Sequence, residues 1–118
     1  MNLLDNAIQA IQLGVEDYCA DTHARLLSAV RNIHSGILLL YKELLRRLSP
    51  ADTNEVLVKA KIVPKREANG KISFIGKGKK TADVQQIRER FAELGIATDW
   101  TRFDRISETR NDVEHYYP

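Results

Sequence analysis

The last nine residues of this 118-residue chain gather more reactive side-chain types than any other stretch. Arg110 is a permanent cation, His115 titrates near neutrality, and Tyr116 and Tyr117 carry phenols. A cation close to a group that takes up and releases protons is suited to acid–base chemistry on an anion. These residues are therefore the candidate site. Whether their side chains can lie close together depends on the secondary structure that carries them.

On a continuous α-helix Arg110 and His115 do not share a face, because five residues correspond to about 140° around the axis. They could still converge if the helix ended or tightened near His115, or if a second copy of the chain supplied facing groups across a two-fold axis. Asn111 shares a face with His115 and could hydrogen-bond the imidazole, which would fix its tautomer. A simpler interpretation pairs Arg110 with Glu114 and packs the tyrosines on a bundle.

The order Arg110, polar Asn111, His115 and Tyr117 reads Arg-x4-His-x-Tyr. This pattern resembles the HEPN domain family, in the form found in HEPN toxins that pair with a nucleotidyltransferase antitoxin. The resemblance implies a metal-independent endoribonuclease that needs no cofactor and forms its site at the interface of a homodimer. It implies catalytic roles for Arg110, His115 and Asn111, and implies that Tyr117 contacts RNA or accepts a nucleotidyl group that silences the site.

The chemistry of RNA cleavage suits these residue types. RNA carries its own nucleophile, the 2′-hydroxyl, so cleavage needs a base for its proton and a cation beside the phosphate. His115, with an ordinary pKa of about 6.5, suits the first role, and the guanidinium of Arg110 suits the second. The product would carry a 2′,3′-cyclic phosphate. The alternative is a non-catalytic helical module that dimerises, recruits a partner or binds RNA.

Apolar periodicity predicts a helix over 3–19 and a second that ends before Pro50, joined as one bent helix or as two. The second is apolar over a wide arc, typical of a central bundle helix or of one that faces a partner. Thr81 and Gly95 predict the cap and the stop of a third helix. A fourth helix is expected from Trp100 onward. The first stripe of the second helix comprises Leu26, Val30, Ile33, Ile37, Leu40, Leu44 and Leu48, and the second comprises Leu27, Leu38, Tyr41 and Leu45.

Residues 54–80 break the helical period. β-Branched residues on both sides of Asn69-Gly70 predict a hairpin with strands at 57–63 and 71–76, followed by a mobile basic loop over 76–81. Residues 59–80 hold eight Lys/Arg against one acid, a net charge of +7 that leaves −5 for the rest. This charge is either an ordinary solvated surface or an arm that binds RNA phosphates. The lysines expected to bind substrate are Lys77, Lys79 and Lys80.

Together these elements predict an all-α fold: a four-helix bundle of HEPN type, formed by a single domain over 1–118, with a β-hairpin insertion around 54–80. The abrupt end at Pro118 is consistent with a domain cut from a longer protein. The N-terminus lacks the features of a secretory signal and the longest apolar run is short, so a cytoplasmic location without membrane contact is expected.

The remaining polar candidates predict no further site. Cys19 is the only cysteine, so no intrachain disulfide can form. His23 and His34 lie eleven residues apart without the spacing of a metal motif, so no metal site is expected. His34 is expected on a partly exposed polar face of the second helix.

Overall fold

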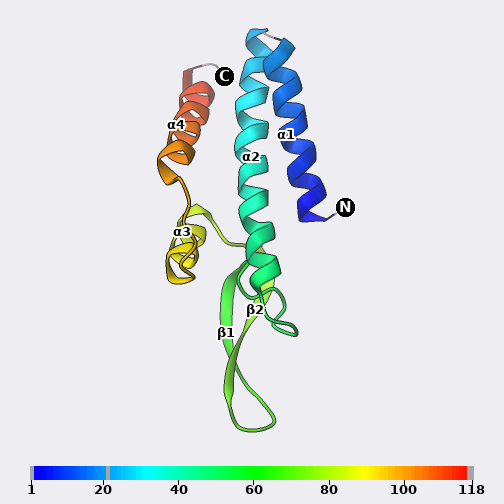
Figure 1. Ribbon diagram of the computed structural model, residues 1–118, viewed down its shortest axis with the longest axis vertical. Helices are drawn as coiled ribbons and strands as arrows, with labels where there is room; N and C mark the ends of the chain where they lie inside the picture. The colour runs from blue at the N-terminus through cyan, green and yellow to red at the C-terminus, as the bar shows by residue number, and fades with distance from the viewer. Residues whose placement is uncertain (1, 21, 117–118) are drawn as a thin grey trace. The chain divides into compact units, whose positions relative to one another are not determined.

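The computed structural model describes residues 2–20 and 22–116, and side chains within them except those of residues 23 and 113–116. These residues form four helices and one two-stranded antiparallel sheet (Figure 1). The expectation of an all-α fold is therefore wrong, because the hairpin is a regular sheet within the fold. The elements are α1 (Leu3–Ala20), α2 (His23–Leu48), β1 (Lys59–Arg66), β2 (Ile72–Thr81), α3 (Val84–Glu93) and α4 (Trp100–Tyr116).

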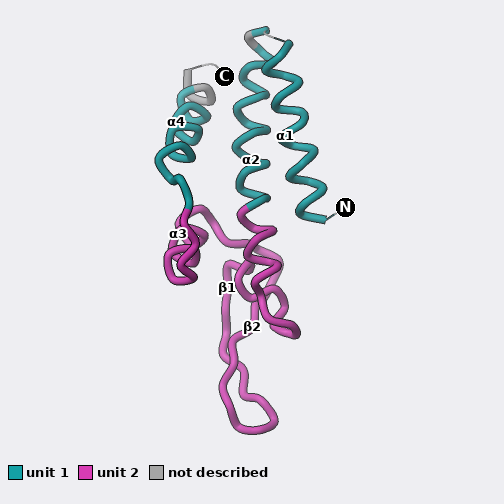
Figure 2. Tube along the Cα trace, in the orientation of Figure 1, with its two compact units in different colours: residues 1–40, 98–118 teal, residues 41–97 magenta. Residues whose placement is uncertain are grey.

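The chain divides into two compact units (Figure 2). The helical unit comprises residues 1–40 and 98–118, with α1, most of α2 and α4; the hairpin unit comprises residues 41–97, with the end of α2, both strands and α3. The predicted four-helix bundle of HEPN type is therefore wrong, because α3 belongs to the same unit as the sheet. The helical unit carries 5 Lys/Arg and 9 Asp/Glu and the hairpin unit 13 and 7, so their net charges are −4 and +6.

Within the helical unit, α1 and α2 are separate helices that pack through glycines. Gly14 of α1 lies against Ile33 of α2, and Gly36 of α2 lies against Ala7 and Ile11 of α1. A Cβ atom added to Gly36 would lie 2.6 Å from Cγ1 of Ile11 and 3.1 Å from the carbonyl oxygen of Ala7. The two backbones thus approach more closely than a side chain allows. This reciprocal contact also shows that the helices run antiparallel.

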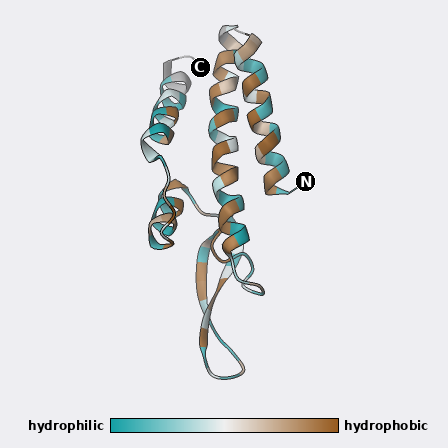
Figure 3. Cartoon of the chain, viewed as in Figure 1, coloured by the Kyte–Doolittle hydropathy of each residue, from teal (hydrophilic) through white to brown (hydrophobic). Residues whose placement is uncertain are grey.

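Apolar residues recur along α2 (Figure 3), and they are only partly buried. Leu45 of the second predicted stripe is fully buried, whereas Leu40, Leu44 and Leu48 of the first stripe are 38%, 38% and 47% exposed. On α1, Tyr18 is 66% exposed. The role of the first stripe as a partner-facing surface stays a prediction.

In the hairpin unit, β1 and β2 pair in the predicted antiparallel sense. Pro64 lies opposite Phe74, and Lys61 lies opposite Lys77, beyond a register shift at the base of the ladder. The predicted turn is present, with Gly70 at a φ of 85° that favours glycine. The mobile loop expected over 76–81 is instead the end of β2. It is held at Gly76, whose amide donates to the Thr53 carbonyl at 2.8 Å.

The helix α3 completes a small core with the base of the hairpin. Its buried residues Ile87 and Phe91 belong to the same unit as the buried Leu45, Val58 and Ala82. The predicted stop at Gly95 is confirmed, since Gly95 has a φ of 70° and the next amide closes onto the Phe91 carbonyl at 2.9 Å. The predicted cap at Thr81 is wrong. Asp83 is the N-cap and forms a capping box with Gln86.

Polar side chains of α3 hold the first residues of β1 in place. Nη1 of Arg90 donates to the carbonyl oxygens of Leu57 at 2.7 Å and of Lys59 at 2.8 Å. Nε2 of Gln86 donates to the Ala60 carbonyl at 3.1 Å. Burial lowers the pKa of Arg90 from its ordinary value, a direction that reflects partial desolvation of the guanidinium. The base of the hairpin is therefore anchored by side chains as well as by its ladder.

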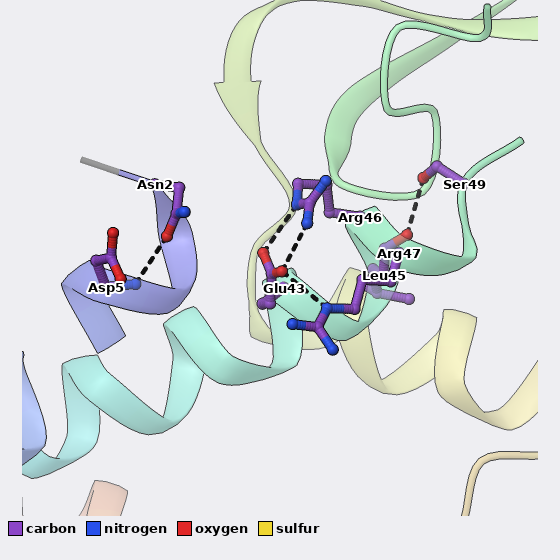
Figure 4. Close-up of polar contacts among 7 residues, drawn as sticks. All are labelled: Asn2, Asp5, Glu43, Leu45, Arg46, Arg47 and Ser49. Atoms are coloured by element: carbon purple, nitrogen blue, oxygen red, sulfur yellow. Dashed lines mark hydrogen bonds and ion pairs between the residues drawn. The ribbon is translucent and has the colours of Figure 1, made fainter. Parts of the chain in front are cut away.

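The last turns of α2 contain an ion-pair cluster in the hairpin unit (Figure 4). The buried Glu43 carboxylate accepts from Nε and Nη2 of Arg46, at 2.8 and 2.7 Å, and from Nε of Arg47 at 3.0 Å. The hydrogen bond from Arg46 is the main cause that lowers the pKa of Glu43 from 4.5 to about 2. The cluster orders the end of α2, where Ser49 Oγ also donates to the Leu45 carbonyl at 2.8 Å.

Candidate functional site

The structure places Arg110 on α4 with its guanidinium against α2, within the helical unit. Its Nη1 lies 3.5 Å from Nδ1 of His34, and its Nη2 donates to Oδ1 of Asn111 at 3.0 Å. Its Nε is buried and has no hydrogen-bond partner among the described residues. A buried donor without a partner costs free energy, and such atoms are uncommon in native proteins. The guanidinium is thus only partly satisfied by its own chain.

The neighbour of Arg110, His34, is only 3% exposed, so the expectation of a partly exposed polar face is wrong. Its ring stacks on Phe103 of α4, with centroids 5.2 Å apart and planes at 26°. Its Nε2 lies 3.1 Å from Oγ of Ser107. His34 therefore contacts α4 at Phe103, Ser107 and Arg110, which follow one another at spacings of four and three residues along one face.

These contacts are satisfied together by one tautomer of the His34 ring. A guanidinium can only donate, so Nδ1 of His34 must act as the acceptor towards Arg110. Only the neutral ring with its proton on Nε2 has a free lone pair at Nδ1. That proton is then donated to Oγ of Ser107. The cluster formed by His34, Ser107 and Arg110 thus carries one positive charge, and that charge is on Arg110.

The positive charge of Arg110 is held by neutral groups. Among the described residues, the guanidinium contacts an imidazole and an amide oxygen and forms no ion pair with a carboxylate. The side chain of Glu114, the partner in the simpler interpretation, lies outside the described side chains. A guanidinium that is partly desolvated and not paired with an acid attracts an anion such as a phosphate.

The remaining predicted residues are brought together only in part. The α-helical backbone includes His115 and ends at Tyr116, so Arg110 and His115 occupy different sides of α4. Both predicted routes to a shared cleft, an end of the helix near His115 and a second copy of the chain, stay predictions. Oδ1 of Asn111 accepts from Arg110, and the predicted contact of Asn111 with His115 lies outside the described side chains. The side chain of His115 lies outside the described side chains, and Tyr117 lies outside the described residues.

The helical unit also has an apolar groove of about 340 Å³. It is lined by Tyr18 of α1, by Val30 and Ile33 of α2 and by Ile106 of α4, with Arg105 as the charged residue in the lining. The described residues that line it include no histidine or carboxylate. The groove can hold an apolar side chain, and the phenol of Tyr18 is the titratable group near neutral to basic pH that its described lining contains.

The predicted substrate-binding lysines, Lys77, Lys79 and Lys80, are all exposed on β2. Lys77 lies directly opposite Lys61, and like charges in such a cross-strand pair repel. A bound polyanion would relieve that repulsion. Phe74, also on β2, is 57% exposed and available for stacking. The described residues contain no group of three or more His, Cys, Asp or Glu side chains that could hold a metal ion.

Sequence reasoning missed His34 and Ser107 as members of the site. A signal for His34 was present, because it lies in phase with Leu27, Leu38, Tyr41 and Leu45 of the second stripe of α2. A polar residue in phase with apolar ones is buried with a partner or is functional. Ser107 gave no signal of its own.

Comparison with known proteins finds no match among protein-family models, curated proteins or solved structures. Among the described residues, no helix has the length and apolar character needed to cross a membrane.

Proposed function

We propose that this chain is a metal-independent endoribonuclease, with Arg110 and His115 as its catalytic residues. Arg110 stabilises the charge that builds up on the scissile phosphate, and His115 takes the proton of the attacking 2′-hydroxyl. The P–O bond to the 5′-oxygen breaks as the 2′-oxygen bonds to phosphorus, which leaves a 2′,3′-cyclic phosphate. The resemblance of Arg110, His115 and Tyr117 to the HEPN toxin pattern is part of this proposal.

The observation that carries the proposal is the way Arg110 is held. Its guanidinium is bound by Nδ1 of His34 and Oδ1 of Asn111 and has a buried Nε without a partner among the described residues. A structural arginine of this degree of burial is normally paired with a carboxylate. An arginine that binds phosphate must keep its charge available, and neutral partners orient it without cancelling that charge.

The separation of Arg110 and His115, about 140° around the axis of a continuous helix, makes a second subunit part of the proposal. In a two-fold dimer, Arg110 of one copy and His115 of the other can face the same phosphate. Exposed apolar residues on α1 and α2, including Ile8, Val15 and Leu40, offer surface for such an interface. The setting we propose is a toxin or defence effector, silenced by a nucleotidyltransferase antitoxin acting on Tyr117.

The test uses purified protein and an oligoribonucleotide of mixed sequence in the presence of EDTA. We expect cleavage with cyclic phosphate ends identified by mass spectrometry, no cleavage of the same oligonucleotide with 2′-deoxy sugars, and loss of cleavage in His115→Ala and Arg110→Lys. Circular dichroism of each variant controls for folding. Unchanged cleavage in both variants, or cleavage that depends on added divalent metal, would refute the proposal.

The apolar groove favours a second candidate, a non-catalytic helical module that binds a partner. In that case Arg110 and His34 only join α2 to α4, and Ile33 and Ile106 line the contact surface. A module of this kind would cleave no RNA, and Ile106→Glu would abolish partner binding while His115→Ala would not.

A further inference from the structure

His34 of α2 forms polar contacts with both Ser107 and Arg110 of α4. His34 is buried and is fixed from two sides, by the ring of Phe103 and by Oγ of Ser107 at 3.1 Å. Its rotation about χ2 is therefore restricted, and Nδ1 has a defined direction towards Nη1 of Arg110. A ring held in this way can set the position of the side chain it contacts.

We propose that His34 is a positioning residue: its neutral ring, with the proton on Nε2, holds the guanidinium of Arg110 in the orientation that receives a phosphate. Ser107 supports this role by accepting the Nε2 proton, which leaves the Nδ1 lone pair for Arg110. The proposal rests on the proposed endoribonuclease function and adds residues that the Arg-x4-His pattern does not contain. His34 itself needs no contact with RNA, in keeping with its burial.

The geometry explains why an imidazole suits this position better than a carboxylate. An acidic residue at position 34 would bind the guanidinium more tightly, but it would also neutralise the charge required at the phosphate. The neutral Nδ1 accepts one hydrogen bond and leaves the net charge of the cluster at one. At 3.5 Å the bond between Nη1 and Nδ1 is long, so it orients the guanidinium while leaving most of its hydrogen-bonding capacity for a bound anion.

Three substitutions at one site separate positioning from packing. His34→Asn keeps an acceptor at about the reach of Nδ1, His34→Gln places its amide at about the reach of Nε2, and His34→Leu keeps only apolar volume. We expect His34→Leu and His34→Gln to lower kcat by about a hundredfold, because a misplacement of about 1 Å can cost that much. We expect KM to change far less, and His34→Asn to recover most of kcat.

Nitrogen NMR spectroscopy provides a readout that does not depend on cleavage. At neutral pH we expect the His34 ring to be neutral with its proton on Nε2, and the Nε–H of Arg110 to give a distinct, slowly exchanging signal that Arg110→Lys removes. His34→Leu should shift that signal towards solvent values, and His34→Asn should retain it. Ser107→Ala should allow the proton to move to Nδ1 in part of the molecules.

Two results would contradict the positioning role of His34. A ring protonated on Nδ1, or an equal loss of kcat in His34→Asn and His34→Leu, would overturn the positioning role and leave a packing role. Absence of RNA cleavage by the wild-type protein would refute the proposed function. In that case the Arg110 signal in the Asn and Leu variants still decides whether His34 holds the guanidinium. An equal shift in both would overturn that claim too.

Discussion

Replacing Arg90 by Met should loosen the base of the hairpin while leaving the volume of the side chain almost unchanged. The substitution removes two hydrogen bonds from one charged nitrogen, to the carbonyls of Leu57 and Lys59. Bonds to charged groups contribute about 1.5–3 kcal/mol each, and the lower value applies because the guanidinium is only partly buried. The expected loss is about 3 kcal/mol for the two together, or about 150-fold in the opening equilibrium.

The amide of Ala82 is the reporter for this prediction. It donates to the Val58 carbonyl at 2.7 Å, between the two carbonyls that Arg90 holds. In Arg90→Met, native-state hydrogen exchange should show protection of the Ala82 amide falling by about 150-fold. The matched control is Arg102→Met, which removes an exposed ion pair with Asp99 and should cost under about 1 kcal/mol. Equal protection at Ala82 in the two variants would show that Arg90 does not anchor the hairpin.

Three further predictions address packing, charge and binding. Gly36→Ala should lower the free energy of unfolding by about 1 kcal/mol in urea titration, since overpacking costs about 1–3 kcal/mol and improved helix propensity returns about 1. The control is Ser35→Ala at an exposed position of the same helix, which should cost nothing. Equal free energies of unfolding in the two variants would refute the close contact at Gly36. Because the folded pKa of Glu43 is lowered from 4.5 to about 2, its contribution to stability is complete above pH 4.5 and is lost as the pH falls towards 2. Glu43→Gln should flatten the dependence of the urea midpoint on pH in that window, and an unchanged slope would contradict the assignment. Three exposed lysines of β2 can be replaced together by alanine: Lys77, Lys79 and Lys80. This change should reduce the slope of log K against log salt for binding of single-stranded RNA by about 2. An unchanged slope would show that these lysines do not contact RNA phosphates.

Local signals predicted the elements of this chain better than their arrangement. The Asn69-Gly70 turn and the stop at Gly95 depend on backbone conformations that few residues adopt, so they could be read directly. The strand at 76–81 was missed because its anchoring depends on a contact with Thr53, distant in sequence. The four-helix bundle was wrong because amphipathic periodicity shows that α3 buries one face but not which unit covers it.

The candidate site shows the same limit. Arg110, Asn111 and His115 were found because they lie within six positions of one another. The partner of Arg110 is 76 residues away, and nothing in a single sequence pairs two such positions. His34 could have been suspected from its phase with Leu38 and the other apolar residues of its stripe, but its orientation towards Arg110 required coordinates.

The hairpin has one more property that follows from having only two strands. Each strand has an outer edge that no further strand of the described residues covers, although Lys59, Ala60 and Gly76 at the base have partners outside the ladder. Such edges can pair with another chain, and lysines and proline are residues that natural sheets use to prevent this. Lys61, Pro64 and Lys77 are residues of these types in the hairpin. High salt or a bound polyanion screens the lysine charges, and this screening should favour edge-to-edge assembly of the chain.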